Sequence, residues 1–289
     1  MATPAQWIAG ARPRTLPAAL APVLVGSGAA AAVDAFDPSI ALLALVVSTS
    51  LQIAVNYAND YSDGVRGTDE ERVGPVRLVG QHLAAPESVK TMAFIFMGIA
   101  VLAGLALVAL ANTLVLLPVG ALAVLAAWRY TGGDNPYGYR GLGEVYVFVF
   151  FGLVATLGTQ YTQIGSITAV GVLGAIGVGA LASAILVANN LRDIPTDSVT
   201  GKTTLAVRLG DTRTRQLYLG LFGVTILCTL LMAIWRPWAP IGLIGLVIAW
   251  PGIQAVRGGA TGKELIPALA LTGFAELMWA VWLFAPLAR

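Results

Sequence analysis

The chain has 289 residues, of which 57% are hydrophobic and 11% are charged, and its formal net charge is +2 at pH 7. A soluble domain carries about a quarter of its residues as charged side chains, so this composition excludes a soluble globular protein and indicates an integral membrane protein. The single cysteine, Cys228, excludes an internal disulfide, and the single histidine, His82, excludes a histidine-based metal site.

The first residues predict a short helix at the membrane surface. Thr3 and Pro4 suit a helix start, and the indole of Trp7 prefers the membrane–water interface. An apolar run follows Arg12 and Arg14, an arrangement that also occurs in cleaved signal peptides. Eight further apolar runs and the proline-rich start favour an uncleaved first membrane helix.

About nine apolar segments are long enough to cross a hydrocarbon core of about 30 Å. They cover residues 15–33, 39–58, 91–110, 112–130, 144–163, 168–190, 215–235, 238–256 and 265–285. A membrane β-barrel would alternate polar and apolar residues instead, so we expect an all-α bundle. The 33 glycines and many alanines allow the close helix packing that such a bundle requires.

Two polar motifs end two of these segments. The first consists of Asn56, Asn59, Asp60 and Asp63, and the second of Asn189, Asn190, Asp193 and Asp197. In the first motif the spacing is i, i+3, i+4, i+7, and the aspartates of the second follow Asn189 at i+4 and i+8. Each set therefore lies on one helix face.

The motifs also share the skeleton N-[DN]-x-x-D, which starts at Asn59 and at Asn189. We interpret this as an internal repeat within one domain of residues 1–289. The two halves would be about 15–130 and 144–256, and the last helix, about 265–285, would follow them.

The four aspartates of the motifs predict a bound divalent cation. Facing carboxylates repel one another in a low dielectric unless a positive charge lies between them. Oxygen ligands without His or Cys suit Mg²⁺, which proteins usually hold through one or two carboxylates together with substrate phosphates. Nearby cations suit the remaining phosphate charge: Arg12, Arg66, Arg77 and Lys202, with Arg72, Arg192 and Arg208 in the same loops. The sequence thus predicts a diphosphate headgroup site whose substrate keeps its tail in lipid.

Three further residues have two readings each. Tyr130 either faces the site and stabilises a cation through its ring, or belongs to an interfacial aromatic belt. Glu144 either caps a helix or orients a second substrate, and we favour capping. Glu276 lies mid-span, where an acid is costly: it either serves the function or, in its protonated form, makes an interhelical hydrogen bond.

Basic residues predict the orientation. Of 17 Lys and Arg residues, 15 lie before the first span or in alternate loops, and only Arg236 and Arg289 fall on the other side. We expect a multi-pass protein of the cell (inner) membrane. The positive-inside rule then places the N-terminus and both motifs in the cytoplasm, and the C-terminus outside.

Five stretches stand out along the chain: A-R-P-R-T-L-P-A-A-L-A-P-V-L-V-G from Ala11, N-D-Y-S-D-G-V-R-G-T-D from Asn59, Y-T-G-G from Tyr130, Y-R-G-L-G-E from Tyr139, and N-N-L-R-D-I-P-T-D-S-V-T-G-K-T-T-L-A from Asn189. With them the chain resembles UbiA-type intramembrane prenyltransferases over essentially its full length. The resemblance is greatest to the branch whose acceptor is 1,4-dihydroxy-2-naphthoate, in menaquinone synthesis.

This resemblance implies a nine-helix bundle around a cavity open to lipid. Asp60 and Asp63 on one side, and Asp193 and Asp197 on the other, would hold Mg²⁺ and diphosphate, and Asn56 and Lys202 match further headgroup contacts. Diphosphate would leave a polyprenyl diphosphate, and the aromatic ring would attack the allylic cation, with loss of CO₂, giving demethylmenaquinone. The implied partners are these two substrates and membrane lipid, with no nucleic acid.

Other functions stay open on the sequence. A related transferase would use a hydroxybenzoate, homogentisate, chlorophyllide or haem acceptor. A secondary transporter would also combine acids, a repeat and glycine-rich helices, but its acids would lie at mid-span. A lipid-binding scaffold would leave the acidic motifs unexplained.

Overall fold

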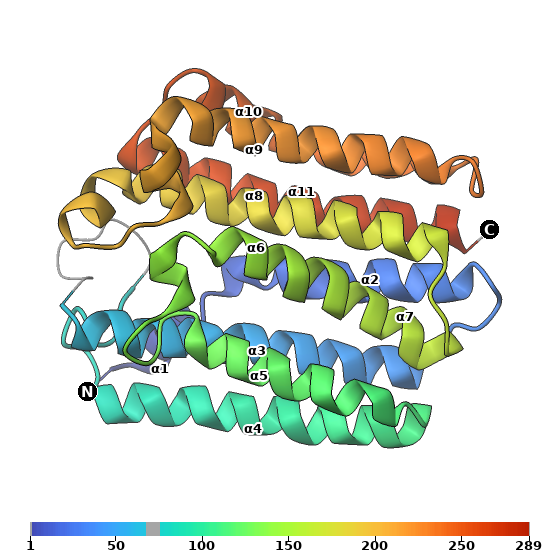
Figure 1. Cartoon of the computed structure of the whole chain (residues 1–289), viewed down its shortest axis with the longest axis horizontal. Helices are drawn as coiled ribbons and strands as arrows, with labels where there is room; N and C mark the ends of the chain where they lie inside the picture. The colour runs from blue at the N-terminus through green and yellow to red at the C-terminus, as the bar shows by residue number, and fades with distance from the viewer. Residues whose placement is uncertain (1, 68–75, 289) are drawn as a thin grey trace.

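The computed structural model describes residues 2–67 and 76–288, and this part of the chain is helical without a β-strand. Figure 1 shows long helices running side by side, with the two termini at opposite ends of the bundle. The all-α membrane fold predicted from composition is therefore confirmed. Arg72 lies outside the described residues.

The chain begins with the predicted short helix, α1, Pro4–Gly10. A reciprocal cap starts it: Thr3 Oγ1 accepts from the backbone N–H of Gln6, and Gln6 Oε1 accepts from the N–H of Thr3. After α1, Arg12 adopts a positive φ of 52° and a 3₁₀ turn, Pro13–Thr15, leads into the bundle. The residues around this turn lie beside the site described below.

Every predicted apolar segment lies in helical structure. The bundle helices are α2 (Pro17–Ala31), α3 (Pro38–Val65), α4 (Pro86–Ala111), α5 (Leu117–Arg129), α6 (Gly143–Val147), α7 (Thr156–Ile164), α8 (Ala169–Val199), α9 (Leu205–Met232), α10 (Trp250–Arg257) and α11 (Ile266–Leu287). Helices α6 and α7 are joined by a π-helical segment, Phe148–Ala155, and 3₁₀ structure over Ala239–Ala249 leads into α10.

The count of nine spans is not confirmed. Within the described residues, seven helical stretches are long and apolar enough to cross a membrane. The first and fourth predicted segments form shorter apolar helices, Pro17–Ala31 and Leu114–Arg129. A 15-residue helix such as α2 rises only about 22 Å, less than the hydrocarbon thickness.

Glycines permit the closest helix contacts, as the composition predicted. A Cβ on Gly152 would lie 2.5 Å from the Cα of Gly179, so the π-helical segment and α8 touch through their backbones. A Cβ on Gly26 of α2 would lie 2.4 Å from the carbonyl oxygen of Thr156. Larger side chains at these positions would force the helices apart.

Two of the predicted segments, 39–58 and 168–190, end before their helices do. Helix α3 continues to Val65 and α8 to Val199, so both acidic motifs occupy the last helical turns. Hydropathy marks where the apolar run stops, whereas backbone hydrogen bonding continues for two further turns. The motif side chains are consequently held on rigid helix ends.

Candidate active site

A cavity of about 1260 Å³ runs into the bundle from the end that carries the motifs. Its walls are mostly apolar and come from α2, α3, α4, α5, α7 and α8, while polar side chains gather around the motif end. The predicted site residues that line it are Arg12, Asn56, Asn59, Asp63, Arg77, Tyr130, Asn189, Asn190 and Lys202. Asp60, Arg66, Asp193 and Asp197 do not line it, so the structure brings part of the predicted set to the cavity surface.

Asp60 holds a loop. Its side chain is fully buried, and its two carboxylate oxygens accept hydrogen bonds from the backbone N–H groups of Leu78 (2.7 Å) and Val79 (3.1 Å). Gly64, one turn later, leaves room for Val79, since a Cβ there would lie 2.5 Å from that side chain. Asp60 thereby fixes the returning loop against the end of α3.

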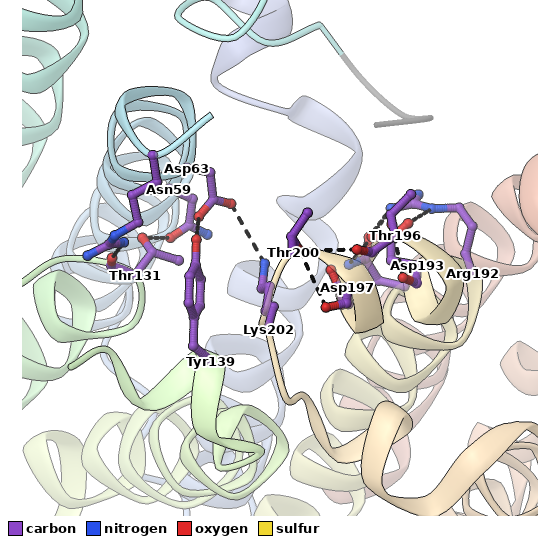
Figure 2. Close-up of polar contacts among 12 residues, drawn as sticks. Asn59, Asp63, Thr131, Tyr139, Arg192, Asp193, Thr196, Asp197, Thr200 and Lys202 are labelled. Carbon is purple, nitrogen blue, oxygen red and sulfur yellow. Dashed lines mark hydrogen bonds and ion pairs between the residues drawn. The ribbon is translucent and has the colours of Figure 1, made fainter. Parts of the chain in front are cut away.

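Asp63 connects three segments. Tyr139 donates its hydroxyl to Asp63 Oδ1 at 2.6 Å, and Lys202 Nζ lies 3.8 Å from Oδ2. The ammonium of Lys202 also lies 4.8 Å from the Tyr139 ring centroid. Figure 2 shows these side chains between the ends of α3 and α8. Tyr139 was absent from the predicted site residues, although its stretch carried part of the family resemblance.

The amides of the first motif bind neighbouring segments. Asn56 Nδ2 donates to the carbonyl of Ala11 and to Thr15 Oγ1, each at 2.9 Å, and Gln52 Nε2 donates to the same hydroxyl at 2.9 Å. Asn59 Oδ1 accepts from Thr131 Oγ1 at 2.7 Å. The segment around Arg12 and the loop after α5 are thus fastened to α3.

Arg66 also fastens a loop. Its guanidinium donates to the backbone carbonyls of Thr131 and Gly133 and lies 5.2 Å from the Tyr139 ring centroid. It therefore stands beside the cavity and not on its wall, in contrast to Lys202.

The second motif contains a buried ion pair. Arg192 donates from Nε to Asp193 Oδ1 at 2.6 Å and from Nη2 to Oδ2 at 2.7 Å, and Nη2 also donates to Asn189 Oδ1 at 2.9 Å. The Arg192 and Asp193 side chains are 4% and 3% exposed. Asp197, one turn on, is buried as well. Figure 2 shows this group across Lys202 from Asp63.

The four aspartates do not form one cluster. Within the described residues, no group of three or more His, Cys, Asp or Glu side chains is placed to hold a metal ion. The assignment of the four aspartates as metal ligands therefore stays a prediction. The donor set still suits Mg²⁺, because Asp63 and the four asparagine amides of the motifs line the same cavity and Mg²⁺ normally completes its shell with water and substrate phosphate. They fit an ion held jointly with a diphosphate and not a preformed protein cage.

Aromatic rings form one wall of the cavity behind this end. Tyr130, Tyr137, Tyr146 and Phe150 all line it, and the Tyr137 and Tyr146 rings stack at 3.8 Å between centroids. The ring centroids of Tyr130 and Tyr137 lie 5.5 Å apart. Burial raises the pKa of Tyr137, so its hydroxyl stays neutral. Of the two readings of Tyr130, the structure places the ring at the cavity.

The two glutamates singled out from the sequence behave differently. Glu144 accepts a hydrogen bond from Asn190 Nδ2 at 2.8 Å, a contact that capping did not anticipate. Glu276 is fully buried, and neither of its carboxyl oxygens has a hydrogen-bond partner among the described residues. The expected interhelical bond of Glu276 is thus not present there.

Comparison with known proteins places this geometry in a family. Residues 19–264 match the UbiA prenyltransferase family. The chain is 56% identical over 281 residues to the 1,4-dihydroxy-2-naphthoate octaprenyltransferase of Mycobacterium tuberculosis, covering 97% of this chain and 96% of that protein. It is 41% identical over 228 residues to the Escherichia coli enzyme of the same name, covering 77% and 74%.

The fold comparison agrees with this. The structure of a UbiA homologue from Archaeoglobus fulgidus bound to GPP and Mg²⁺ superposes with a TM-score of 0.71 at 15% identity, covering 98% of this chain and all of that one. The apo UbiA homologue from Aeropyrum pernix superposes with a TM-score of 0.69 at 13% identity, covering 93% and 97%. The chain belongs to the UbiA prenyltransferase family and is a membrane prenyltransferase.

Proposed function

We propose that this UbiA-family chain transfers a polyprenyl group from an allylic polyprenyl diphosphate to 1,4-dihydroxy-2-naphthoate. A carbon–carbon bond forms between the prenyl C1 and the ring as the C1–O bond breaks and diphosphate leaves. The bond between the ring and its carboxylate also breaks, the ring keeps the electron pair, and CO₂ leaves. The product is demethylmenaquinone in its reduced form. The observation that carries the proposal is the match over nearly the whole chain to a 1,4-dihydroxy-2-naphthoate octaprenyltransferase. A cavity that is polar at one end and apolar elsewhere supports it.

The polar end would bind the diphosphate. Lys202, Arg77 and Arg12 line it, and a diphosphate oxygen would gain charge-assisted hydrogen bonds from them. Asp60, Asp63, Asp193 and Asp197 would hold Mg²⁺, which supplies neutralisation of the leaving diphosphate when bound. The amides Asn56, Asn59, Asn189 and Asn190 would orient headgroup or acceptor, and Arg66 would support the diphosphate through the loop that it holds.

The rest of the cavity would protect the reacting centre. Apolar walls exclude water that would quench an allylic cation, and the Tyr130 ring offers its negative face to that cation. The chain then needs no nucleophile of its own, because positioning and electrostatic stabilisation provide the catalysis.

One assay tests the proposal. Purified protein in detergent would receive Mg²⁺, an allylic polyprenyl diphosphate and a panel of aromatic acceptors, with products identified by mass. We expect prenylated, decarboxylated product from dihydroxynaphthoate, complete loss of activity with EDTA, and recovery with Mg²⁺. Transfer to a hydroxybenzoate or homogentisate alone would replace the acceptor assignment, and full activity in chelator would contradict the metal.

In the proposed orientation the protein lies in the bacterial inner membrane, with the motif end on the cytoplasmic side and the C-terminus outside. Supporting it is the basic-residue asymmetry of the sequence. The only cysteine is buried Cys228, so a Cys228→Ala background makes single-cysteine reporters simple to build. Cysteines at Gly201 and at Gly259 should resist an impermeant thiol reagent in intact cells, whereas one at Trp238 should react. Labelling of the first two from outside would reverse the orientation.

A further inference from the structure

Glu144 and Asn190 form a buried pair at the edge of the cavity. Glu144 lies in the first turn of α6 and Asn190 lies on α8, and the two side chains are 7% and 6% exposed. Asn190 lines the cavity, and Glu144 stands behind it. The carboxylate is thus withdrawn from the reacting space but controls a residue on its wall.

The hydrogen bond fixes which way the amide points. Asn190 Nδ2 donates to Glu144 Oε1 at 2.8 Å, and an ionised carboxylate can only accept. The donor end of the amide is therefore held toward Glu144, and the oxygen end is directed away from it. Within the described part of the chain, Asn190 Oδ1 accepts no hydrogen bond.

Asn190 is separate from the headgroup contacts of its neighbours. Asn189, the residue before it, is bonded to Arg192, and Arg192 pairs with Asp193. Asn190 lies on the side of Tyr130 instead: a Cβ on Gly143 would lie 3.5 Å from the Tyr130 ring and 3.1 Å from Leu186, one turn before Asn190. The amide oxygen therefore belongs with the aromatic part of the cavity.

Packing alone does not account for this arrangement. Glu144 Oε2 is buried and has no hydrogen-bond partner among the described residues. A buried carboxylate with one satisfied oxygen is costly, and an apolar side chain would fill the same space more stably. Such unsatisfied groups persist where they hold a functional residue in place.

We propose that Glu144 is a positioning residue that holds the Asn190 amide oxygen toward the cavity, where it accepts a hydrogen bond from a ring hydroxyl of the aromatic acceptor. This inference rests on the proposed function and adds to it the group that recognises a ring hydroxyl of the acceptor. A site built to bond a hydroxyl rejects analogues that lack it, because its buried polar group is then left unpaired. Glu144 would thus contribute to acceptor choice without touching the acceptor.

The test compares the dihydroxy acceptor with its two monomethyl ethers, using full-length protein in detergent with Mg²⁺ and a polyprenyl diphosphate. In Glu144→Leu and Asn190→Leu we expect kcat/KM for the dihydroxy acceptor to fall by about tenfold or more, while KM for the prenyl diphosphate stays within about twofold. The preference over at least one ether should shrink toward unity. The double variant should be no worse than either single variant, because both changes remove the same hydrogen bond.

Two further variants guard against a folding artefact. Ser183→Ala removes a hydroxyl that donates to the backbone carbonyl of Glu144 at 3.2 Å, so it disturbs the same helix contact and should leave acceptor preference unchanged. Glu144→Gln keeps an oxygen that can accept from Asn190 and should recover part of the lost preference. Unchanged preference in Glu144→Leu, or equal losses for donor and acceptor, would overturn the inference. If the wild type prenylates no dihydroxynaphthoate, the proposed function is overturned instead. The roles of Glu144 and Asn190 can then still be tested by measuring the binding of dihydroxynaphthoate to the variants in the absence of prenyl diphosphate.

Discussion

The two acidic motifs share a sequence skeleton but hold different partners. At the end of α3, Asp60 binds backbone groups 18 and 19 residues away, and Asp63 binds Tyr139, 76 residues away. At the end of α8, Asp193 binds Arg192, its neighbour in the chain. The first motif thus organises the surrounding loops, whereas the second carries its own counter-ion. The shared skeleton thus predicts that each motif lies at a helix end. It does not predict the hydrogen-bond partners of the aspartates, which differ between the two motifs.

Removing one carboxylate from each motif gives the largest expected effect and tests whether both serve the chemistry. Asp63→Ala and Asp193→Ala should each lower the rate of prenyl transfer by roughly two to three decades, since each removes an expected metal ligand. Steady-state kinetics at saturating Mg²⁺ measures this, and Asp134→Ala is a matched control, because Asp134 is exposed at the same end. Near-normal turnover in Asp193→Ala would reduce the second motif to an ion pair that stabilises α8.

The two cations beside Tyr139 should also differ. Lys202 lines the cavity, whereas Arg66 is bonded to two backbone carbonyls. Lys202→Ala should weaken binding of a non-hydrolysable prenyl diphosphate analogue by about 1.5–3 kcal/mol, because an oxyanion loses a charged donor. Arg66→Ala should have the smaller effect on this Kd and barely change acceptor binding. Equal and large losses of affinity would place Arg66 on the headgroup as well. Normal binding in both variants would mean that neither cation binds the diphosphate.

Asp60 should act on stability as well as activity if it organises a loop. Asp60→Asn keeps one acceptor oxygen but turns an amide toward the second backbone N–H, so we expect a loss of about 1–3 kcal/mol from an unpaired buried group. The measurement is the apparent Tm in detergent. Asp197→Asn, in the second motif, should shift the Tm less, and a larger shift there would reverse the comparison.

The smallest effect concerns the amides. Asn56→Ala removes hydrogen bonds to Ala11 and Thr15 and should cost roughly 0.5–1.5 kcal/mol, together with faster hydrogen exchange in residues 11–16. Ser48→Ala removes a bond from the same helix, α3, to Ala19 of α2, and should leave exchange in residues 11–16 unchanged. If Asn56→Ala leaves it unchanged too, the amide does not fasten this segment.

Much of the fold follows from the sequence because its determinants are local. Hydropathy located all the apolar helices, and the Thr3 cap and Trp7 marked α1. Helical spacing also placed each motif on one face, and the structure puts both motifs at the same end of the bundle, where α3 and α8 end (Figure 1).

The missing part of the site consists of long-range contacts. Thr131 and Tyr139 are common residue types, and only the packing of the loops around the end of α3 brings them to Asn59 and Asp63. Arg66 shows the same limit: its charge suggested phosphate, but a backbone turn at Thr131–Gly133 presents carbonyls to it. A signal was present in the stretch Y-R-G-L-G-E, which the resemblance marked without assigning roles.

The π-helical segment between α6 and α7 has a consequence for insertions and deletions. Cavity-lining residues recur there in steps of four: Tyr146, Val147, Phe150, Phe151, Val154 and Ala155. In an α-helix, steps of four drift around the axis by about 40° each, whereas the wider turns of i→i+5 bonding make the same steps drift the other way. The π-helical segment between α6 and α7 therefore offsets the drift of the α-helical turns beside it. Deleting one residue from Phe148–Ala155 would favour α-helical bonding, and the drift of about 40° per step of four would then run through the whole helix. The aromatic wall of this cavity therefore depends on the length of this helix as well as on the identity of its side chains.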